Sequence, residues 1–127
     1  MSYEFMFLLM IFLHIVDDFC LQQFSLSNLK QKSFWEKNAP DKIYENDYQT
    51  ALAMHGISWA FMIMLPIAIK VSFNINYTYV VALCINALIH IVVDDIKANE
   101  KKINLTQDQL IHMIQILATF AVAVIWG

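Results

Sequence analysis

The sequence contains no arginine, and glycine, proline and cysteine occur only twice each among its 127 residues. Charged residues make up 15% of the chain, and eight lysines against eleven acids leave a net charge of -3. Such a chain has no basic stripe that could follow a phosphate backbone, which argues against nucleic-acid binding. Cys20 and Cys84 lie in apolar stretches and define no disulfide framework.

The sequence is rich in apolar residues and poor in charged ones. Hydrophobic residues form 59% of the sequence, and its mean hydropathy is +0.53. Soluble domains contain about 45–50% apolar and about 25% charged residues. The composition therefore predicts an integral membrane protein, with the lipid bilayer as its surroundings.

Four apolar stretches have the length of a membrane-spanning helix, which needs about 20 residues. They cover about residues 3–24, 50–70, 77–97 and 107–126, and a polar loop occupies residues 25–49. The first stretch lacks the basic start of a signal peptide and carries Glu4 there, so we interpret it as a retained span. The predicted fold is all-α: a single transmembrane domain, residues 1–127, built as a four-helix bundle.

Lysine counting predicts the orientation, because cytoplasmic loops next to spans are rich in basic residues. The first and third loops hold seven of the eight lysines if Lys97 is included, and the second loop has only Lys70. Both termini are therefore expected on the non-cytoplasmic side. Lysine without arginine and the low glycine content are typical of an AT-rich genome, which suggests a bacterial inner membrane protein or a phage protein.

Each of the four histidines falls in a different predicted span. Three of them have an aspartate four residues away, in the pairs His14 with Asp18, His90 with Asp94, and Asp108 with His112. Residues at this spacing share one helical face. A single pair of this kind is more typical of interhelical hydrogen bonding than of metal binding. Only the three pairs and the fourth histidine together favour a metal site.

The histidines also lie at similar depths. With a rise of about 1.5 Å per residue, His55 and His112 lie about 7 Å, His90 about 10 Å and His14 about 15 Å from the cytoplasmic ends of their spans. Buried carboxylates need counter-charges, which protonated imidazoles, Lys97 or divalent ions could supply. We favour a metal, zinc first and iron or manganese next, with one or two ions left open. The predicted ligands are His14, Asp18, His55, His90, Asp94, Asp108 and His112.

Two further acids are adjacent to these ligands. Asp17 precedes Asp18, and Asp95 follows Asp94. On an α-helix each would point about 100° away from the direction of its paired neighbour. We expect them to face loops, headgroups or the surroundings of the site, and assign them no primary role.

Three motifs in this order resemble a family of small bacterial and phage integral membrane proteins known as a domain of unknown function. His14 to Gln22 is similar to its H-x3-D-F-x-L-Q signature, His90 to Lys97 to its H-x3-D-x2-K segment, and Asp108 to His112 to its D-Q-x2-H segment. His55 corresponds to the histidine of the family's second helix, where members often carry another histidine one turn away; this chain has Ala51 there. The resemblance implies the fold and the site, and no activity.

The leading functional prediction is a metal-dependent hydrolase of a lipid or of another membrane-associated ester or phosphoester, with a site open to the cytoplasm. Metal-activated water would attack, and one of Asp18, Asp94 and Asp108 would act as the general base. A non-enzymatic metal or proton transporter or sensor is the first alternative, and a small structural or regulatory membrane protein is the second. The sequence leaves homo-oligomerisation open.

Overall fold

A computed structural model describes residues 1–21 and 25–126, and all regular secondary structure within these ranges is helical. This confirms the all-α prediction. The elements are α1 (Tyr3–Ile15), the π-helical turn η1 (Val16–Leu21), α2 (Ser25–Leu29), α3 (Lys32–Asn38), the 3-10 turn η2 (Lys42–Tyr44), α4 (Asp47–Lys70), α5 (Tyr77–Asp95), the π-helical turn η3 (Ile96–Glu100) and α6 (Leu105–Trp126).

Three helical stretches are long and apolar enough to cross a membrane: Lys42–Lys70, Tyr77–Glu100 and Leu105–Ile125. They agree with the second, third and fourth predicted spans. The first predicted span, residues 3–24, is helical from Tyr3 to Leu21, and residues 22–24 lie outside the described ranges. This segment carries three acids, Glu4, Asp17 and Asp18. Its crossing of a membrane stays a prediction.

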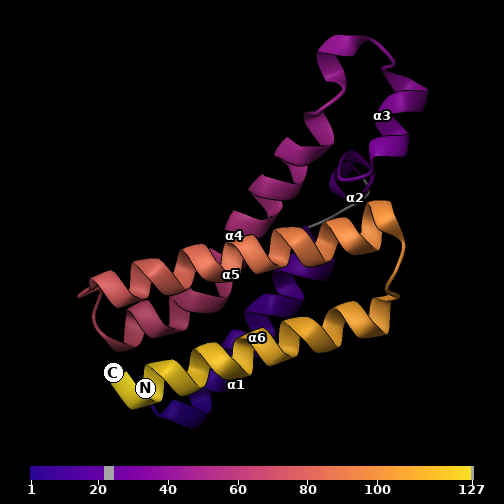
Figure 1. Ribbon diagram of the computed structural model, residues 1–127. Coiled ribbons are helices and arrows are strands. Elements are labelled where there is room, and N and C mark those ends of the chain that lie inside the picture. The colour runs from indigo at the N-terminus through magenta and orange to yellow at the C-terminus, as the bar shows by residue number, and fades with distance from the viewer. Residues whose placement is uncertain (22–24, 127) are drawn as a thin grey trace.

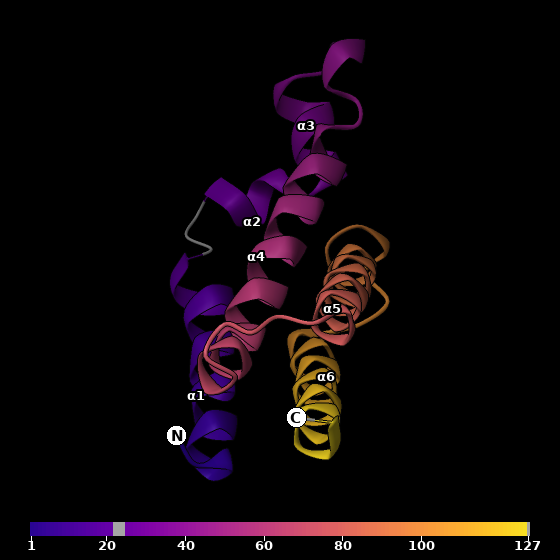
Figure 2. The same ribbon diagram turned by 90° about the vertical axis from the view of Figure 1, so that its left-hand side faces the viewer.

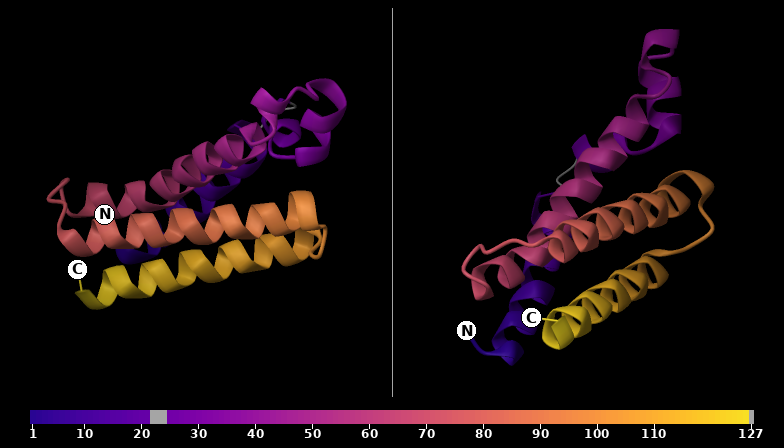
Figure 3. Two further views of the ribbon diagram at one scale, coloured as in Figure 1. Left: turned by 45° about the horizontal axis from the view of Figure 1, so that its top comes forward. Right: turned by 60° about the vertical axis from the view of Figure 1, so that its left-hand side comes forward.

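Helices α1, α4, α5 and α6 pack against one another, and the short helices α2 and α3 pack against α4 (Figures 1 and 2). Both termini lie at the same end of the molecule as the connection 71–76 (Figure 3), and we call this the terminal end. Residues 25–46 and 101–104 lie at the opposite end, which we call the loop end.

Side-chain caps define the starts of two helices at the terminal end. The side chain of Ser2 accepts a hydrogen bond from the backbone N–H of Phe5, and that of Asn76 accepts one from the N–H of Tyr79. These bonds satisfy amide donors that have no partner within the helix. Pro66 lies in the last turns of α4, close to where this helix ends.

The outer faces of the long helices are apolar, and much of the interior is polar. A soluble bundle has the opposite arrangement. Large hydrophobic side chains more than half exposed include Phe5, Leu8, Phe12, Met54, Ile57, Phe61, Leu88, Val92, Leu110, Ile114 and Leu117. This pattern fits helices that contact lipid.

An apolar core fills the terminal half of the interior. It consists of Met6, Met10, Trp59, Ala60, Ile63, Met64, Ile67, Ala87 and Ile116. On the loop side of this core, Gly56 brings α4 close to α5. A Cβ at position 56 would clash with Cγ1 of Ile91 and lie 3.1 Å from the carbonyl oxygen of Ala87. The missing side chain therefore permits the close approach that sets His55 beside His90.

Candidate metal centre

The predicted ligands gather in one buried layer on the loop side of the apolar core. The layer receives His14 and Asp18 from α1 and η1, His55 from α4, His90 and Asp94 from α5, and Asp108 and His112 from α6. All four histidines, Asp94 and Asp108 are at most 2% exposed, and the side chain of Asp18 is 7% exposed. Four separate helical segments thus contribute polar groups to one small volume.

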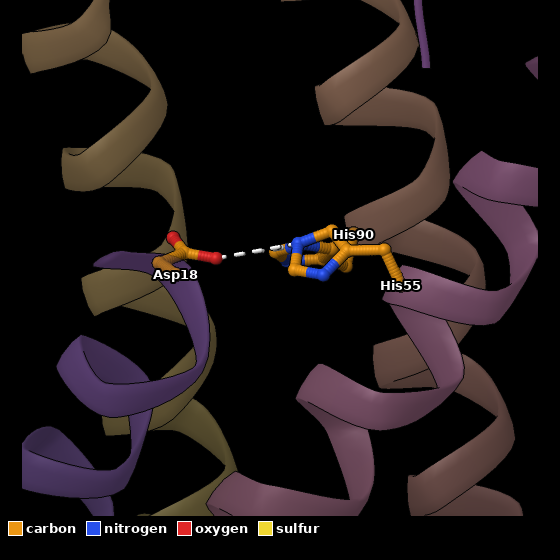
Figure 4. Close-up of side chains that lie close together, drawn as sticks. All are labelled: Asp18, His55 and His90. Atoms are coloured by element: carbon orange, nitrogen blue, oxygen red, sulfur yellow. Dashed lines mark hydrogen bonds and ion pairs between the residues drawn. The ribbon is translucent and has the colours of Figure 1, made fainter. Parts of the chain in front are cut away.

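Four atoms from three of these segments lie close to one another around the two imidazoles of His55 and His90. Nε2 of His55 and Nε2 of His90 are 2.8 Å apart. Oδ1 of Asp18 lies 3.3 Å and 3.9 Å from these two nitrogens, and Oδ2 of Asp94 lies 3.4 Å and 3.6 Å from them. Figure 4 shows Asp18 pointing from η1 toward the two imidazoles.

Some of these separations are those expected between metal ligands. A tetrahedron with metal–ligand bonds of about 2.0–2.1 Å has edges of about 3.3–3.4 Å. The distances from Nε2 of His55 to the two carboxylate oxygens, 3.3 Å and 3.4 Å, have this length, whereas the two imidazole nitrogens lie at hydrogen-bond distance. Imidazole nitrogen and carboxylate oxygen are the ligands that zinc, iron and manganese accept. We call these atoms of Asp18, His55, His90 and Asp94 the four-atom position.

Asp94 also faces a second group of side chains. Its Oδ1 lies 3.7 Å from Nε2 of His112, and the same nitrogen lies 3.2 Å from Oδ1 of Asp108. Potential metal-binding groups among the described residues include Asp18, His55 and His90; His90, Asp94 and His112; and Asp18, Asp108 and His112. Six of the seven predicted ligands belong to these groups.

His14, the seventh predicted ligand, uses both ring nitrogens for hydrogen bonds. The indole N–H of Trp59 donates to its Nδ1 over 2.7 Å, and its Nε2 lies 2.9 Å from Oε1 of Gln109. Because indole nitrogen can only donate, Nδ1 of His14 must accept, and Nε2 donates to Gln109. The amide nitrogen of Gln109 then donates to Asp18 and Asp108, over 3.0 and 3.1 Å. In this structure His14 orients carboxylates through Gln109.

Known proteins were compared with the chain in sequence and in structure. No protein-family model, curated protein or solved structure matches it. The family resemblance of the three motifs stays a prediction, and function is argued from the site itself.

Two of the histidines have a polar partner on the nitrogen that points away from the cluster. Nδ1 of His55 lies 3.5 Å from Oδ2 of Asp17, whose other oxygen accepts a 2.7 Å hydrogen bond from Ser58. Nδ1 of His112 lies 3.0 Å from Oε1 of Gln115. Such partners fix the tautomer of metal-binding histidines and direct the other nitrogen toward the ion.

Asp17 is therefore closer to the site than its spacing suggests. An α-helix would turn it away from the direction of Asp18, but η1 winds as a π-helix and both side chains point into the bundle. Asp17 is 1% exposed. Asp95, in contrast, accepts a hydrogen bond from Asn99 outside the cluster.

Two lysines reach the cluster from the loop end. Nζ of Lys30 lies 2.8 Å from Oδ2 of Asp94, and Nζ of Lys97 lies 2.8 Å from Oδ2 of Asp108 and 3.8 Å from Oδ1 of Asp94. Lys30 is only 4% exposed although it comes from the polar loop. Asn99 fixes this part of the loop, because its side chain bonds to the carbonyl of Lys30 and to the N–H of Lys32.

The charges of these groups do not balance. Asp17, Asp18, Asp94 and Asp108 carry four negative charges, and Lys30 with Lys97 supplies two positive ones. With neutral imidazoles the cluster keeps an excess of two negative charges. A buried excess of this size requires cations or protons, and a divalent ion would cancel it.

Trp59 closes the cluster toward the apolar core. Its ring stacks on His90 with centroids 4.3 Å apart, and His90 stacks in turn on His112 at 4.1 Å. Trp59 is fully buried. Trp59, Lys30 and Gln115 were not among the predicted site residues, and for Asp17 the surroundings of the site were one of three predicted locations. Only Gln115 had a local signal, since it lies three residues after His112 on the same helical face.

Proposed function

We propose that this chain is a membrane-embedded metal-binding protein, built as a four-helix membrane bundle, that holds a divalent ion at the four-atom position. The observation that carries this proposal is the buried group of Asp18, His55 and His90, whose ligand atoms lie within 4.8 Å of one another, with Oδ2 of Asp94 3.4 Å and 3.6 Å from the two imidazole nitrogens. Zinc is the favoured ion because it commonly takes four nitrogen and oxygen ligands at this spacing. The two excess negative charges of the cluster support the same conclusion.

We further propose that the ion serves hydrolysis of a lipid or of another membrane-associated ester or phosphoester. A divalent ion supplies a Lewis acid that acidifies water and polarises the ester. Asp18 and Asp94 belong to the four-atom position, so in a centre with one ion Asp108 is the aspartate left to act as the general base. Lys97 is 28% exposed, which marks the loop end as the side of access.

The lysines indicate which side of the membrane this is. Lys30, Lys97 and five other lysines lie in or beside the loop end, and Lys70 lies at the terminal end. By the positive-inside rule the loop end faces the cytoplasm and the termini lie outside. In a bacterial inner membrane, substrate would then reach the site from the cytoplasmic side.

One observation favours a second candidate, a metal or proton transporter or sensor. Buried polar groups continue from His112 toward the terminal end: Gln115 donates to the carbonyl oxygen of Asn86, and Asn86 donates to the hydroxyl of Thr119. Thr119 lines a cavity of about 520 Å³ at the terminal end. A transporter needs such a polar connection between the two sides of the membrane, whereas a hydrolase does not.

Metal analysis tests the shared core of both candidates. We expect the detergent-purified wild type to contain stoichiometric metal by elemental analysis, and His90→Gln to lose the ion at the four-atom position. Asp95→Asn is the matched control, because Asp95 lies next to Asp94 but accepts a hydrogen bond from Asn99 outside the cluster. A folded wild type without metal would contradict the proposal.

Activity separates the two candidates. The metal-loaded wild type is expected to hydrolyse a member of a panel of phospholipids and soluble phosphoesters, and His90→Gln is expected to be inactive. Metal-dependent uptake into proteoliposomes without hydrolysis would favour the transporter.

A further inference from the structure

Unpaired polar atoms mark a second cation position beside the first. Among the described residues, five buried side-chain atoms have no hydrogen-bond partner. Three of them lie around His112: its Nε2 is 3.7 Å from Oδ1 of Asp94 and 3.2 Å from Oδ1 of Asp108. All three residues are at most 1% exposed. Buried polar atoms are rarely left without a partner, so their convergence requires a cause.

The hydrogen bonds of His112 determine what Nε2 offers. The amide nitrogen of Gln115 donates to the backbone carbonyl oxygen of Asn86 over 3.3 Å, and a carbonyl can only accept. Oε1 of Gln115 therefore faces Nδ1 of His112, which must donate to it over 3.0 Å. In the neutral imidazole the lone pair of Nε2 then points at two carboxylate oxygens. Three electron-rich atoms in this arrangement repel one another unless Nε2 carries a proton or a metal ion lies between them.

Asp94 connects this position with the four-atom position. Its Oδ2 faces His55 and His90, while its Oδ1 faces His112. A carboxylate whose two oxygens face different ligand groups is a natural bridge between two metal ions. We propose that the centre is a two-metal site, in which Asp94 bridges one ion at the four-atom position and a second ion held by Asp108 and His112.

This inference rests on the proposed function and narrows its substrate class. Two divalent ions and the ammonium groups of Lys30 and Lys97 outweigh the four carboxylates by two positive charges. Such a centre attracts an anionic phosphoester more strongly than a neutral carboxylic ester. Pairs of metal ions also stabilise both the attacking and the leaving oxygen in phosphoryl transfer. A membrane-associated phosphoester is therefore the substrate class that the centre fits best.

Metal stoichiometry tests the proposal without any activity assay. We expect zinc-loaded wild type in detergent to bind two ions per chain after removal of loosely bound metal. His112→Gln is expected to bind one ion, because it removes only the second position. His55→Gln is also expected to lose one ion. Asp95→Asn is the matched control and is expected to keep two, because Asp95 lies next to Asp94 but faces Asn99 outside the cluster.

Because His112→Gln or His55→Gln could fold poorly, a spectroscopic measurement on the wild type and on a different variant tests the same proposal. Manganese-loaded wild type is expected to give an electron paramagnetic resonance spectrum of two coupled ions, and Asp108→Asn that of an isolated ion. One ion in the wild type, with no change in His112→Gln, would overturn the two-metal site but leave the metal-binding proposal intact. Absence of any metal would overturn both.

Discussion

Replacing Lys30 by methionine tests the charge balance of the cluster. Lys30 and Asp94 form a buried pair 2.8 Å apart, and they are 4% and 1% exposed. Removing one partner of a buried ion pair costs about 3–5 kcal/mol, because the other charge stays buried without compensation. Lys97 lies 3.8 Å from Asp94 and retains part of the compensation. We therefore expect Lys30→Met to lower the free energy of unfolding of the metal-free protein by about 3 kcal/mol.

Bound metal should reduce this loss. Once an ion neutralises Asp94, the remaining cost is that of exchanging an aliphatic stem of similar volume, about 1 kcal/mol. The difference of about 2 kcal/mol corresponds to metal binding about 30-fold tighter in Lys30→Met than in the wild type. The mutation thus destabilises the protein and strengthens its hold on the ion.

The assay is thermal unfolding in detergent, with and without a chelator, combined with metal titration. Lys32→Met is the matched control, since Lys32 lies in the same loop, is exposed, and bonds to Asn99 through its backbone N–H. It should change neither stability nor affinity. An equal loss of stability for Lys30→Met in the metal-free and metal-loaded protein would refute the electrostatic argument.

Three other predictions follow from the packing around the site. Gly56→Ala should lower the free energy of unfolding by about 1–3 kcal/mol, because the new Cβ meets Ile91 and the α5 backbone. It should also weaken metal binding, because it moves His55 away from His90. Thermal unfolding measures the first effect and metal titration the second. Trp59→Phe leaves Nδ1 of His14 without its donor and should cost about 1–3 kcal/mol in unfolding, with metal stoichiometry unchanged. Chelation of the wild type should lower its unfolding temperature, and added zinc should restore it.

Much of the site could be predicted from the sequence because its ligands obey helical spacing. His90 with Asp94 and Asp108 with His112 share helical faces, and similar depth in the spans places them in one layer. The same reasoning put His14 among the ligands, and this shows its limit. Trp59 supplies a donor to His14 across 45 positions of the chain, and no local pattern reveals that contact.

Other parts of the site depend on tertiary contacts. Lys30 belongs to the polar loop, and only the return of that loop onto Asn99 carries its ammonium group to Asp94. A few polar groups also lie beside the apolar core of the terminal half. Asn86, Gln115 and Thr119 carry no charge, so a search for ionisable residues does not find them, yet they form a buried hydrogen-bonded series.

Because η1 is a π-helical turn, the geometry of the site depends on the number of residues in this segment. Within α-helical winding, adjacent residues point about 100° apart, yet Asp17 and Asp18 both point inward in η1. A π-helical turn holds one more residue than the α-helical turn that it replaces. Deleting Val16 would allow α1 to continue with regular winding and would turn one of the two acids toward lipid. In this segment the deletion of a residue would disturb the site more than a substitution.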